Sequence, residues 1–269
     1  IKKVEGQLGG ALFERNAAEV RITSLGERVV AQARRVLEES VKLEEIAKEG
    51  RDPLAGPLRL GVIYTIAPYL LPPLIPALHR CAPAMPLFLK EDFTGNLIPA
   101  LKSGELDVIV IALPIDEPGL VAQPVYDEPF RVVVPAGHPW SRRPEVEAAE
   151  LDGQDLLLLG QGNCFRDQVL ESCPHLNGPD ALEHSLEGSS LETIRHMVAS
   201  GAGVAVMPST AADPLDGKES LVKVLPFVGP SPSRRVGLVW RVTFPRPQAI
   251  DAVRAAVLGC KLPGATAVR

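Results

Sequence analysis

The sequence predicts an α/β protein in which a two-lobe domain follows a long helix. From residue 58 onward, short apolar runs alternate with helical patterns. This alternation is typical of a mostly parallel sheet with helices on both faces. Apolar segments at 130–135 and 236–241 read as strands where the chain crosses to a second lobe and returns. Two α/β lobes joined in this way leave a cleft in which small ligands usually bind.

The composition is that of an ordinary soluble globular protein. The 269 residues suit one large domain or two smaller ones, with 46% hydrophobic and 23% charged residues. The net charge of −5 argues against nucleic-acid binding over the whole surface. Residues 1–35, however, carry seven Lys or Arg against four Glu, which indicates an anion-binding end.

The sequence shows no apolar run near 18 residues and no export signal, so we expect a cytoplasmic protein with no membrane contact. The four cysteines fit a reducing compartment. In that compartment a disulfide is more often regulatory than structural.

The N-terminal segment predicts a short helix, a ribbon and a long helix. Residues 1–12 are amphipathic until Gly9-Gly10, and a two-strand ribbon is expected around 16–19. Ser24-Leu-Gly-Glu27 reads as a capping box that opens a helix to about Glu49. Its apolar positions follow a heptad seam, which favours pairing between subunits over packing on its own domain. The seam is Val29, Ala33, Val36, Ser40, Leu43 and Ala47.

A Gly- and Pro-rich linker at 50–57 precedes the two lobes. The first lobe is expected to hold strands at 58–64, 87–90 and 108–113 and helices at 68–80 and 96–103. The second lobe is expected to hold a strand at 156–159, helices from 164 and at 191–200, and a strand at 204–207. The strand at 236–241 and a helix at 248–259 then complete the first lobe.

Two cysteines, Cys164 and Cys173, lie at the two ends of one predicted helix, which Pro174 ends. A helix rises about 1.5 Å per residue, so nine steps place their Cα atoms roughly 13 Å apart. A disulfide needs Cα atoms closer than about 7 Å. The two thiols can therefore pair only if the segment between them melts or kinks.

Cys164 also has the surroundings of a reactive thiol. It lies at a helix N-terminus that favours the thiolate, and Arg166 is two residues on. Exposed thiolates of this kind oxidise to sulfenic acid, and Cys173 would then be the resolving thiol. The alternative is two unrelated core cysteines. Cys-x8-Cys is not a metal spacing, so we expect no metal and no cofactor.

The chain resembles the LysR-type transcriptional regulators. Residues 1–15 and Thr23-Ser-Leu-Gly26 are similar to the end of their winged helix-turn-helix. The resemblance implies a periplasmic-binding-protein-like regulatory domain, preceded by a linker helix and the remnant of that DNA-binding domain. The domains implied are a remnant at 1–23, a dimerisation helix at 24–50, a hinge at 51–57, lobe I at 58–129 and 234–269, and lobe II at 130–233.

Within that family the sequence is most similar to the hydrogen-peroxide sensors. The similar stretches are Pro68–Pro72, Asp127–Pro129, Cys164–Gln168 with Cys173, Ser190–Thr193 and Gly237–Val239. The resemblance implies that Cys164 reacts with peroxide and Cys173 resolves it.

The resemblance also implies a set of pocket residues. Thr65 and Thr94 match the peroxide-pocket threonines, whose hydroxyls can both donate and accept hydrogen bonds. Arg166 and Arg241 match basic residues that could stabilise a thiolate or sulfenate. Asn163 stands where some members have His. A further pocket His of some members falls near His184 or Ser185, and both assignments stay open.

The function implied is a peroxide-sensing transcription activator rather than an enzyme. Its expected partners are promoter DNA and RNA polymerase for the full-length protein, hydrogen peroxide, a cellular thiol reductant, and further copies of itself in a homodimer or homotetramer. The front of the recognition helix is absent, so Lys2 and Lys3 would contact DNA phosphates only weakly. The alternatives are a regulator that binds a small organic effector in the interlobe cleft and a thiol peroxidase.

Overall fold

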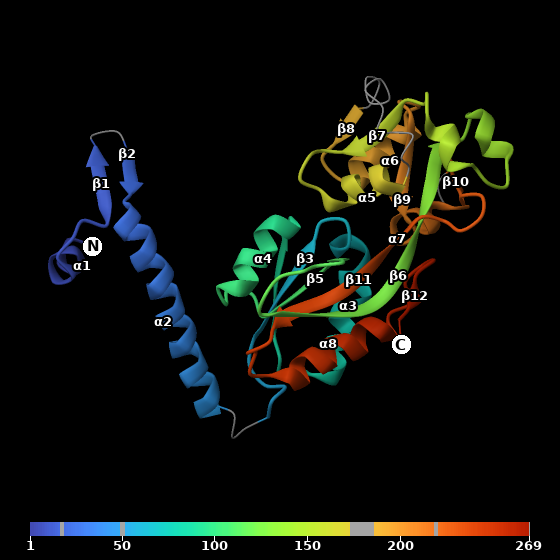
Figure 1. Ribbon diagram of the computed structural model, residues 1–269. Coiled ribbons are helices and arrows are strands. Elements are labelled where there is room, and N and C mark those ends of the chain that lie inside the picture. Colours follow the sequence, from blue (N-terminus) through green and yellow to red (C-terminus); the bar gives the residue numbers. More distant parts are fainter. Residues whose placement is uncertain (17–18, 49–51, 173–185, 218–219, 269) are drawn as a thin grey trace. The chain divides into compact units, whose positions relative to one another are not determined.

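The computed structural model describes residues 1–16, 19–48, 52–172, 186–217 and 220–268, and the chain divides after Asp52 into two units (Figure 1). The first unit is residues 1–52 and the second is residues 53–269. None of the helices in the described part is long and apolar enough to cross a membrane.

The first unit contains a short helix and a two-strand ribbon before the long helix. Its elements are α1 (Lys2–Leu8), β1 (Phe13–Asn16), β2 (Glu19–Ile22) and α2 (Ser24–Lys48). Gly9 ends α1 with a left-handed backbone, φ 71°. The carboxylate of Glu5 accepts hydrogen bonds from the N–H groups of Leu12 (2.8 Å) and Phe13 (3.1 Å), which fixes the turn into β1. The predicted helix, break and ribbon are confirmed.

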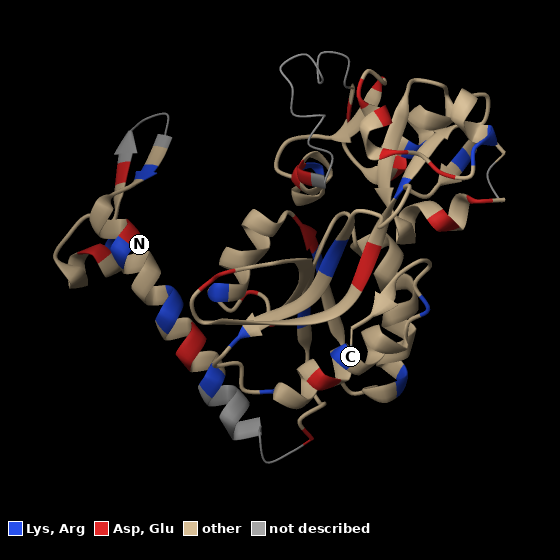
Figure 2. Ribbon diagram, turned by 45° about the vertical axis from the view of Figure 1, so that its right-hand side comes forward, with Lys and Arg blue, Asp and Glu red and all other residues tan. Residues whose placement is uncertain are grey.

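The start of α2 differs by one residue from the prediction. The Thr23 hydroxyl, not Ser24, caps the helix, because it accepts from the Gly26 N–H at 2.9 Å. The same hydroxyl donates to the Ala11 carbonyl (2.8 Å), so the ribbon holds Thr23 in the capping position. Acidic and basic residues alternate along the described part of α2 (Figure 2). On the predicted seam, Ala33, Val36 and Ser40 are exposed.

The second unit begins with the lobe I sheet. Strands β3, β4 and β5 are parallel, and β11 joins them antiparallel beside β5. Apolar side chains of this sheet and of its helices form one buried core. The elements are β3 (Leu58–Ile63), α3 (Ala67–Cys81), β4 (Leu87–Asp92), α4 (Thr94–Lys102), β5 (Val108–Leu113), β11 (Ser233–Arg241) and α8 (Pro247–Gly259).

Strand β6 (Leu120–Pro135) belongs to both lobes, and Figure 1 shows it running from one to the other. Its first part, 120–129, pairs with β11, and residues 130–133 pair with β9. The prediction at 130–135 found only the second part. The first part carries Gln123, Pro124 and Asp127, which interrupt the apolar pattern that identifies a strand.

Lobe II has its own core around the strand order β6-β9-β7-β8, with β10 on the other edge of β6. The elements are β7 (Leu156–Leu159), α5 (Cys164–Ser172), β8 (Leu186–Gly188), α6 (Leu191–Ala199), β9 (Val204–Pro208), α7 (Ser209–Ala212) and β10 (Val222–Leu225). The described residues of this lobe also form single-turn helices at Pro139–Arg142, Ala148–Leu151 and Asp213–Leu215. A short C-terminal strand, β12 (Thr266–Ala267), returns to β6.

Close packing requires a residue without a Cβ at position 203, directly before β9. A Cβ added there would overlap the Asp155 carbonyl oxygen, which accepts the Val204 N–H at 2.9 Å. We expect Gly203→Ala to lower the free energy of unfolding by about 1–3 kcal/mol, because backbone must shift to make room. Urea denaturation measures this. Gly137→Ala, where a Cβ meets nothing within 4 Å, is the matched control, and equal losses in both variants would contradict the packing argument.

Candidate functional site

Three segments that are far apart in the sequence line one small pocket. They are the end of β3, the junction of β4 with α4, and the loop before α5. The volume open to the centre of a water-sized molecule is about 10 Å³, which is room for about one such molecule. The lining residues are Ile63, Tyr64, Thr65, Asp92, Phe93, Thr94, Gly162, Asn163 and Cys164.

The loop before α5 places Cys164 in this pocket. Gly162 turns the chain with φ 89°, a left-handed conformation that favours glycine. The buried Asn163 side chain donates to the Gly160 carbonyl (2.9 Å), and the Asn163 carbonyl accepts the Arg166 N–H (3.0 Å). Cys164 is therefore the first residue of α5, as predicted. Its half-buried side chain packs against the core of lobe I, although α5 belongs to lobe II.

The Thr94 hydroxyl faces the thiol. Its Oγ1 lies 3.7 Å from Cys164 Sγ, within hydrogen-bonding range for sulfur. Thr94 begins α4 and Cys164 begins α5, so the N-termini of two helices meet at the pocket. Both helix ends favour negative charge there, whether on a thiolate or on an oxygen.

Asp92 is the one carboxylate among the pocket residues. It accepts from the Asn96 side chain (2.7 Å) and from the Phe93 N–H (2.8 Å), in the first turn of α4. The hydrogen bond from Asn96, more than any other contact, lowers the pKa of Asp92. The negative charge of Asp92 is thus stabilised by the first turn of α4.

Thr65 forms the inner wall of the pocket and is 3% exposed. Its hydroxyl oxygen accepts from Arg234 Nη1 (2.8 Å), and its carbonyl accepts from Arg234 Nη2 (2.9 Å). Because the guanidinium occupies a lone pair of Oγ1, the Thr65 O–H hydrogen can be donated into the pocket. The structure therefore brings Thr65, Thr94, Asn163 and Cys164 together.

Arg234 belongs to a buried ion pair that the sequence reasoning missed. Its Nε lies 2.7 Å from Glu128 Oε2, and both side chains are completely buried. The other carboxylate oxygen of Glu128 accepts from the backbone N–H (3.0 Å) and the hydroxyl of Thr210. The guanidinium also lies over the Phe165 ring, 5.1 Å from its centroid. Arg234 thus contacts lobe I, strand β6 and the residue next to Cys164.

A signal for Arg234 was present in the sequence. In β11 it alternates with Val236 and Leu238, so the period of two places a charged side chain on the buried face. A buried charge of this kind requires a partner. Glu128, in the stretch Asp127-Glu-Pro129, is that partner.

The prediction that Arg241 belongs to the pocket needs correction. Arg241 lies at the other end of β11, seven residues from Arg234, which is roughly 23 Å along a strand and on the opposite face. Its guanidinium donates to the carbonyls of Leu101 and Leu106 and lies 3.9 Å from Asp107. Those contacts hold α4 and β5 together.

Arg166 also points away from the thiol. It donates to the Leu159 carbonyl (2.9 Å) and to Glu187 (2.7 Å), and it does not line the pocket. Lys2 and Lys3 are exposed on α1, in the first unit. Cys173, His184 and Ser185 lie outside the described residues.

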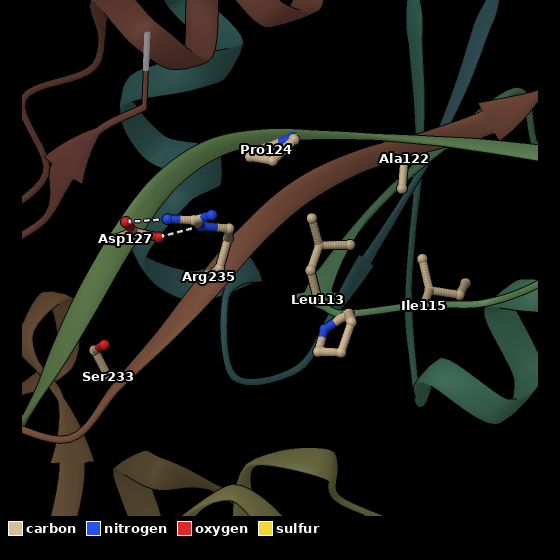
Figure 3. A pocket seen from close by; sticks show the side chains of 8 residues that line it. Leu113, Ile115, Ala122, Pro124, Asp127, Ser233 and Arg235 are labelled. Carbon is tan, nitrogen blue, oxygen red and sulfur yellow. Dashed lines mark hydrogen bonds and ion pairs between the residues drawn. The ribbon is translucent and has the colours of Figure 1, made fainter.

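A second pocket lies on lobe I alone and shares no residue with the first (Figure 3). Its volume is about 600 Å³. Asp127 and Arg235 form a two-pronged ion pair at one end, with distances of 2.7 and 2.8 Å, and Arg235 lowers the pKa of Asp127. The lining residues are Leu113, Pro114, Ile115, Ala122, Pro124, Asp127, Ser233 and Arg235.

Comparison with known proteins decides the family. The sequence model of one protein family, the LysR substrate binding domain, matches residues 51–259. This chain belongs to the LysR family. Its LysR-type relatives include the DNA-binding transcriptional dual regulator OxyR of Escherichia coli K12, 39% identical over 263 residues that cover 96% of this chain and 85% of the relative.

Solved structures of LysR-type proteins agree with this assignment. A full-length OxyR cysteine variant from Pseudomonas aeruginosa matches with a TM-score of 0.81 and 48% identity, over 98% of this chain and 87% of that one. A cysteine-to-serine variant of Corynebacterium glutamicum OxyR, with hydrogen peroxide bound, matches with a TM-score of 0.72 and 30% identity, over 96% and 81%. The predicted LysR-type, two-lobe α/β fold is therefore confirmed, and within the LysR family the chain groups with OxyR.

Proposed function

We propose that this LysR-type chain is a hydrogen-peroxide-sensing transcriptional regulator whose sensing atom is Cys164 Sγ. The observation that carries the proposal is the pocket itself. It brings one thiol, two threonine hydroxyls and two helix N-termini around a space for about one water-sized molecule. Relatives from Escherichia coli are named hydrogen peroxide-inducible genes activators, and the C. glutamicum structure holds hydrogen peroxide.

The pocket residues supply the groups that the first step needs. The Cys164 thiolate attacks one peroxide oxygen, the O–O bond breaks, and Cys164 becomes a sulfenic acid. The other oxygen leaves as hydroxide and takes up a proton to become water. The Thr65 hydroxyl, whose oxygen already accepts from Arg234, donates a hydrogen bond to that leaving oxygen. Thr94 orients the sulfur.

The second step would convert oxidation into a conformational change. The sulfenic acid condenses with the Cys173 thiol to form a disulfide and release water. Because α5 extends from Cys164 to Ser172, the disulfide requires this helix to unwind or bend. Such a change moves Phe165, whose ring lies 5.1 Å from both the Phe130 ring and the Arg234 guanidinium. The α5 segment is thus the two-state element, and the contacts of Phe165 connect it to both lobes.

The remaining partners follow from the same proposal. The exposed seam residues Ala33, Val36 and Ser40 of α2 fit a homodimer, with a homotetramer as the assembled form. The full-length protein would act on promoter DNA and RNA polymerase in the cytoplasm, with Lys2 and Lys3 near phosphates. A cellular thiol reductant would restore the two thiols.

Mass spectrometry of alkylated thiols tests the proposal. After about one equivalent of peroxide, we expect Cys164 and Cys173 to be joined and protected from alkylation, whereas Cys81 and Cys260 stay reduced and are labelled after unfolding. Dithiothreitol should restore the thiols of Cys164 and Cys173, so that all four cysteines are labelled. Alkylation of Cys164 at the same yield before and after peroxide would rule the proposal out.

A second candidate function is the binding of a small organic effector. The 600 Å³ pocket favours it, because its volume lies in the range of about 300–1,000 Å³ that small-molecule sites occupy. It lies on lobe I rather than in the interlobe cleft, where the sequence predicts an effector site. Thermal shifts with small organic acids, together with Cys164 that stays unreactive toward peroxide, would favour this function over peroxide sensing.

A further inference from the structure

Two aromatic rings stand at the rim of the Cys164 pocket. Tyr64 (42%), Phe93 (37%) and Gly162 are its exposed lining residues, whereas Thr65 and Asn163 are buried. The two ring centroids lie 5.1 Å apart and the ring planes are inclined at 73°, an edge-to-face pair. Gly162 contributes only backbone. The rim therefore consists of two rings from lobe I and bare main chain from lobe II.

The backbone on both sides holds these rings in place. Phe93 donates its N–H to Asp92, and its carbonyl accepts the Leu97 N–H (3.0 Å) at the start of α4. Tyr64 sits in the tight turn after β3, which the Ile66 N–H closes onto the Ile63 carbonyl (2.9 Å). Edge-to-face contact adds about 0.5–1.5 kcal/mol to such a pair. The rings are thus placed before any ligand arrives.

We propose that the Tyr64–Phe93 pair is the size filter of the peroxide pocket, which admits hydrogen peroxide and excludes organic hydroperoxides. This inference rests on the proposed function of Cys164. The pocket has room for about one water-sized molecule, and the two rings are the largest side chains on its exposed side. Hydrogen peroxide adds only one oxygen to that size, whereas an organic hydroperoxide adds a carbon group as well.

An organic hydroperoxide can react with Cys164 only if its carbon group also enters the pocket. With either oxidant the thiolate attacks the terminal OH oxygen, the O–O bond breaks, and the sulfur becomes a sulfenic acid. The second oxygen leaves as hydroxide or as alkoxide and takes up a proton. The carbon group stays on this leaving oxygen, so it must fit in the pocket during the step. Removing a rim ring makes that space.

The test compares the rate of Cys164 sulfenic acid formation with hydrogen peroxide and with tert-butyl hydroperoxide, by dimedone trapping and mass spectrometry of the full chain. In Phe93→Ala and Tyr64→Ala we expect the preference for hydrogen peroxide to fall by about tenfold or more, which is the range that shape alone discriminates. The fall should come from a faster reaction with the bulky oxidant. Phe93→Leu, a milder change, should shift the preference in the same direction.

Two further variants separate ring size from other effects. Tyr64→Phe keeps the ring and should keep the wild-type preference. Phe88→Ala removes an exposed phenylalanine (61%) from β4 outside the pocket and should also keep it. An unchanged preference in Phe93→Ala, Phe93→Leu and Tyr64→Ala overturns the filter, and so does a loss in Tyr64→Phe as large as that in Tyr64→Ala.

Different results would overturn the size filter and the proposed function of Cys164. If wild-type Cys164 reacts with hydrogen peroxide no faster than a simple thiol does, both are overturned. If wild-type Cys164 reacts quickly with both oxidants, only the filter is overturned and peroxide sensing stands.

Discussion

Replacing Cys164 by Ser is expected to abolish the response to peroxide. The substitution keeps the size of the side chain and leaves Thr94 a hydrogen-bond partner in the pocket, so the fold should be preserved. It removes the one atom among the described pocket residues that can take oxygen from a peroxide, because the serine hydroxyl neither ionises at neutral pH nor forms an analogue of sulfenic acid. Peroxide-dependent transcription from a target promoter should fall to the level without peroxide.

Cys260 provides the matched control. Its thiol donates to the Ala256 carbonyl (3.2 Å) at the end of α8 in lobe I, and burial raises its pKa, which keeps it in the unreactive thiol form. Cys260→Ser should therefore respond to peroxide as the wild type does. A full response in Cys164→Ser, or the loss of the response in Cys260→Ser alone, would contradict the assignment of the sensing thiol.

Breaking the buried ion pair is expected to have the largest effect on stability. Arg234→Met removes one charge and leaves the Glu128 carboxylate completely buried, with only Thr210 as a described partner. Removal of one member of such a pair typically costs about 3–5 kcal/mol. Urea denaturation of the full chain, followed through the transition of the second unit, should show this loss in the free energy of unfolding. The pocket should loosen as well, because Thr65 loses both contacts with the guanidinium.

The neighbouring residue offers the control. Arg235 pairs with Asp127 through two hydrogen bonds of 2.7 and 2.8 Å, but these side chains are 52% and 39% exposed. Water replaces such contacts, so Arg235→Met should change stability little. The double variant Arg234→Met with Glu128→Gln should lose less than the single changes added together, because the uncompensated charge is gone. Equal losses in Arg234→Met and Arg235→Met would contradict the role of the buried pair.

Several elements followed from local sequence alone. The helix that begins at Cys164 and the strand 156–159 were predicted and are confirmed. Each depends on signals within a few residues, namely a glycine loop and an apolar run of strand length. The LysR resemblance added Thr65 and Thr94 to the site, and both line the pocket with Cys164.

The sequence by itself determined the approximate positions of most long helices and strands and the presence of a thiol at the start of α5, because these depend on residues that are neighbours in the chain. Only the tertiary structure decided which arginine binds the pocket residue Thr65, that Tyr64 pairs with Phe93, and that a lobe II thiol packs against the core of lobe I. These contacts join residues 29 to 169 positions apart. No local pattern encodes them, since the pairing of strands and the crossing by β6 set which distant side chains meet.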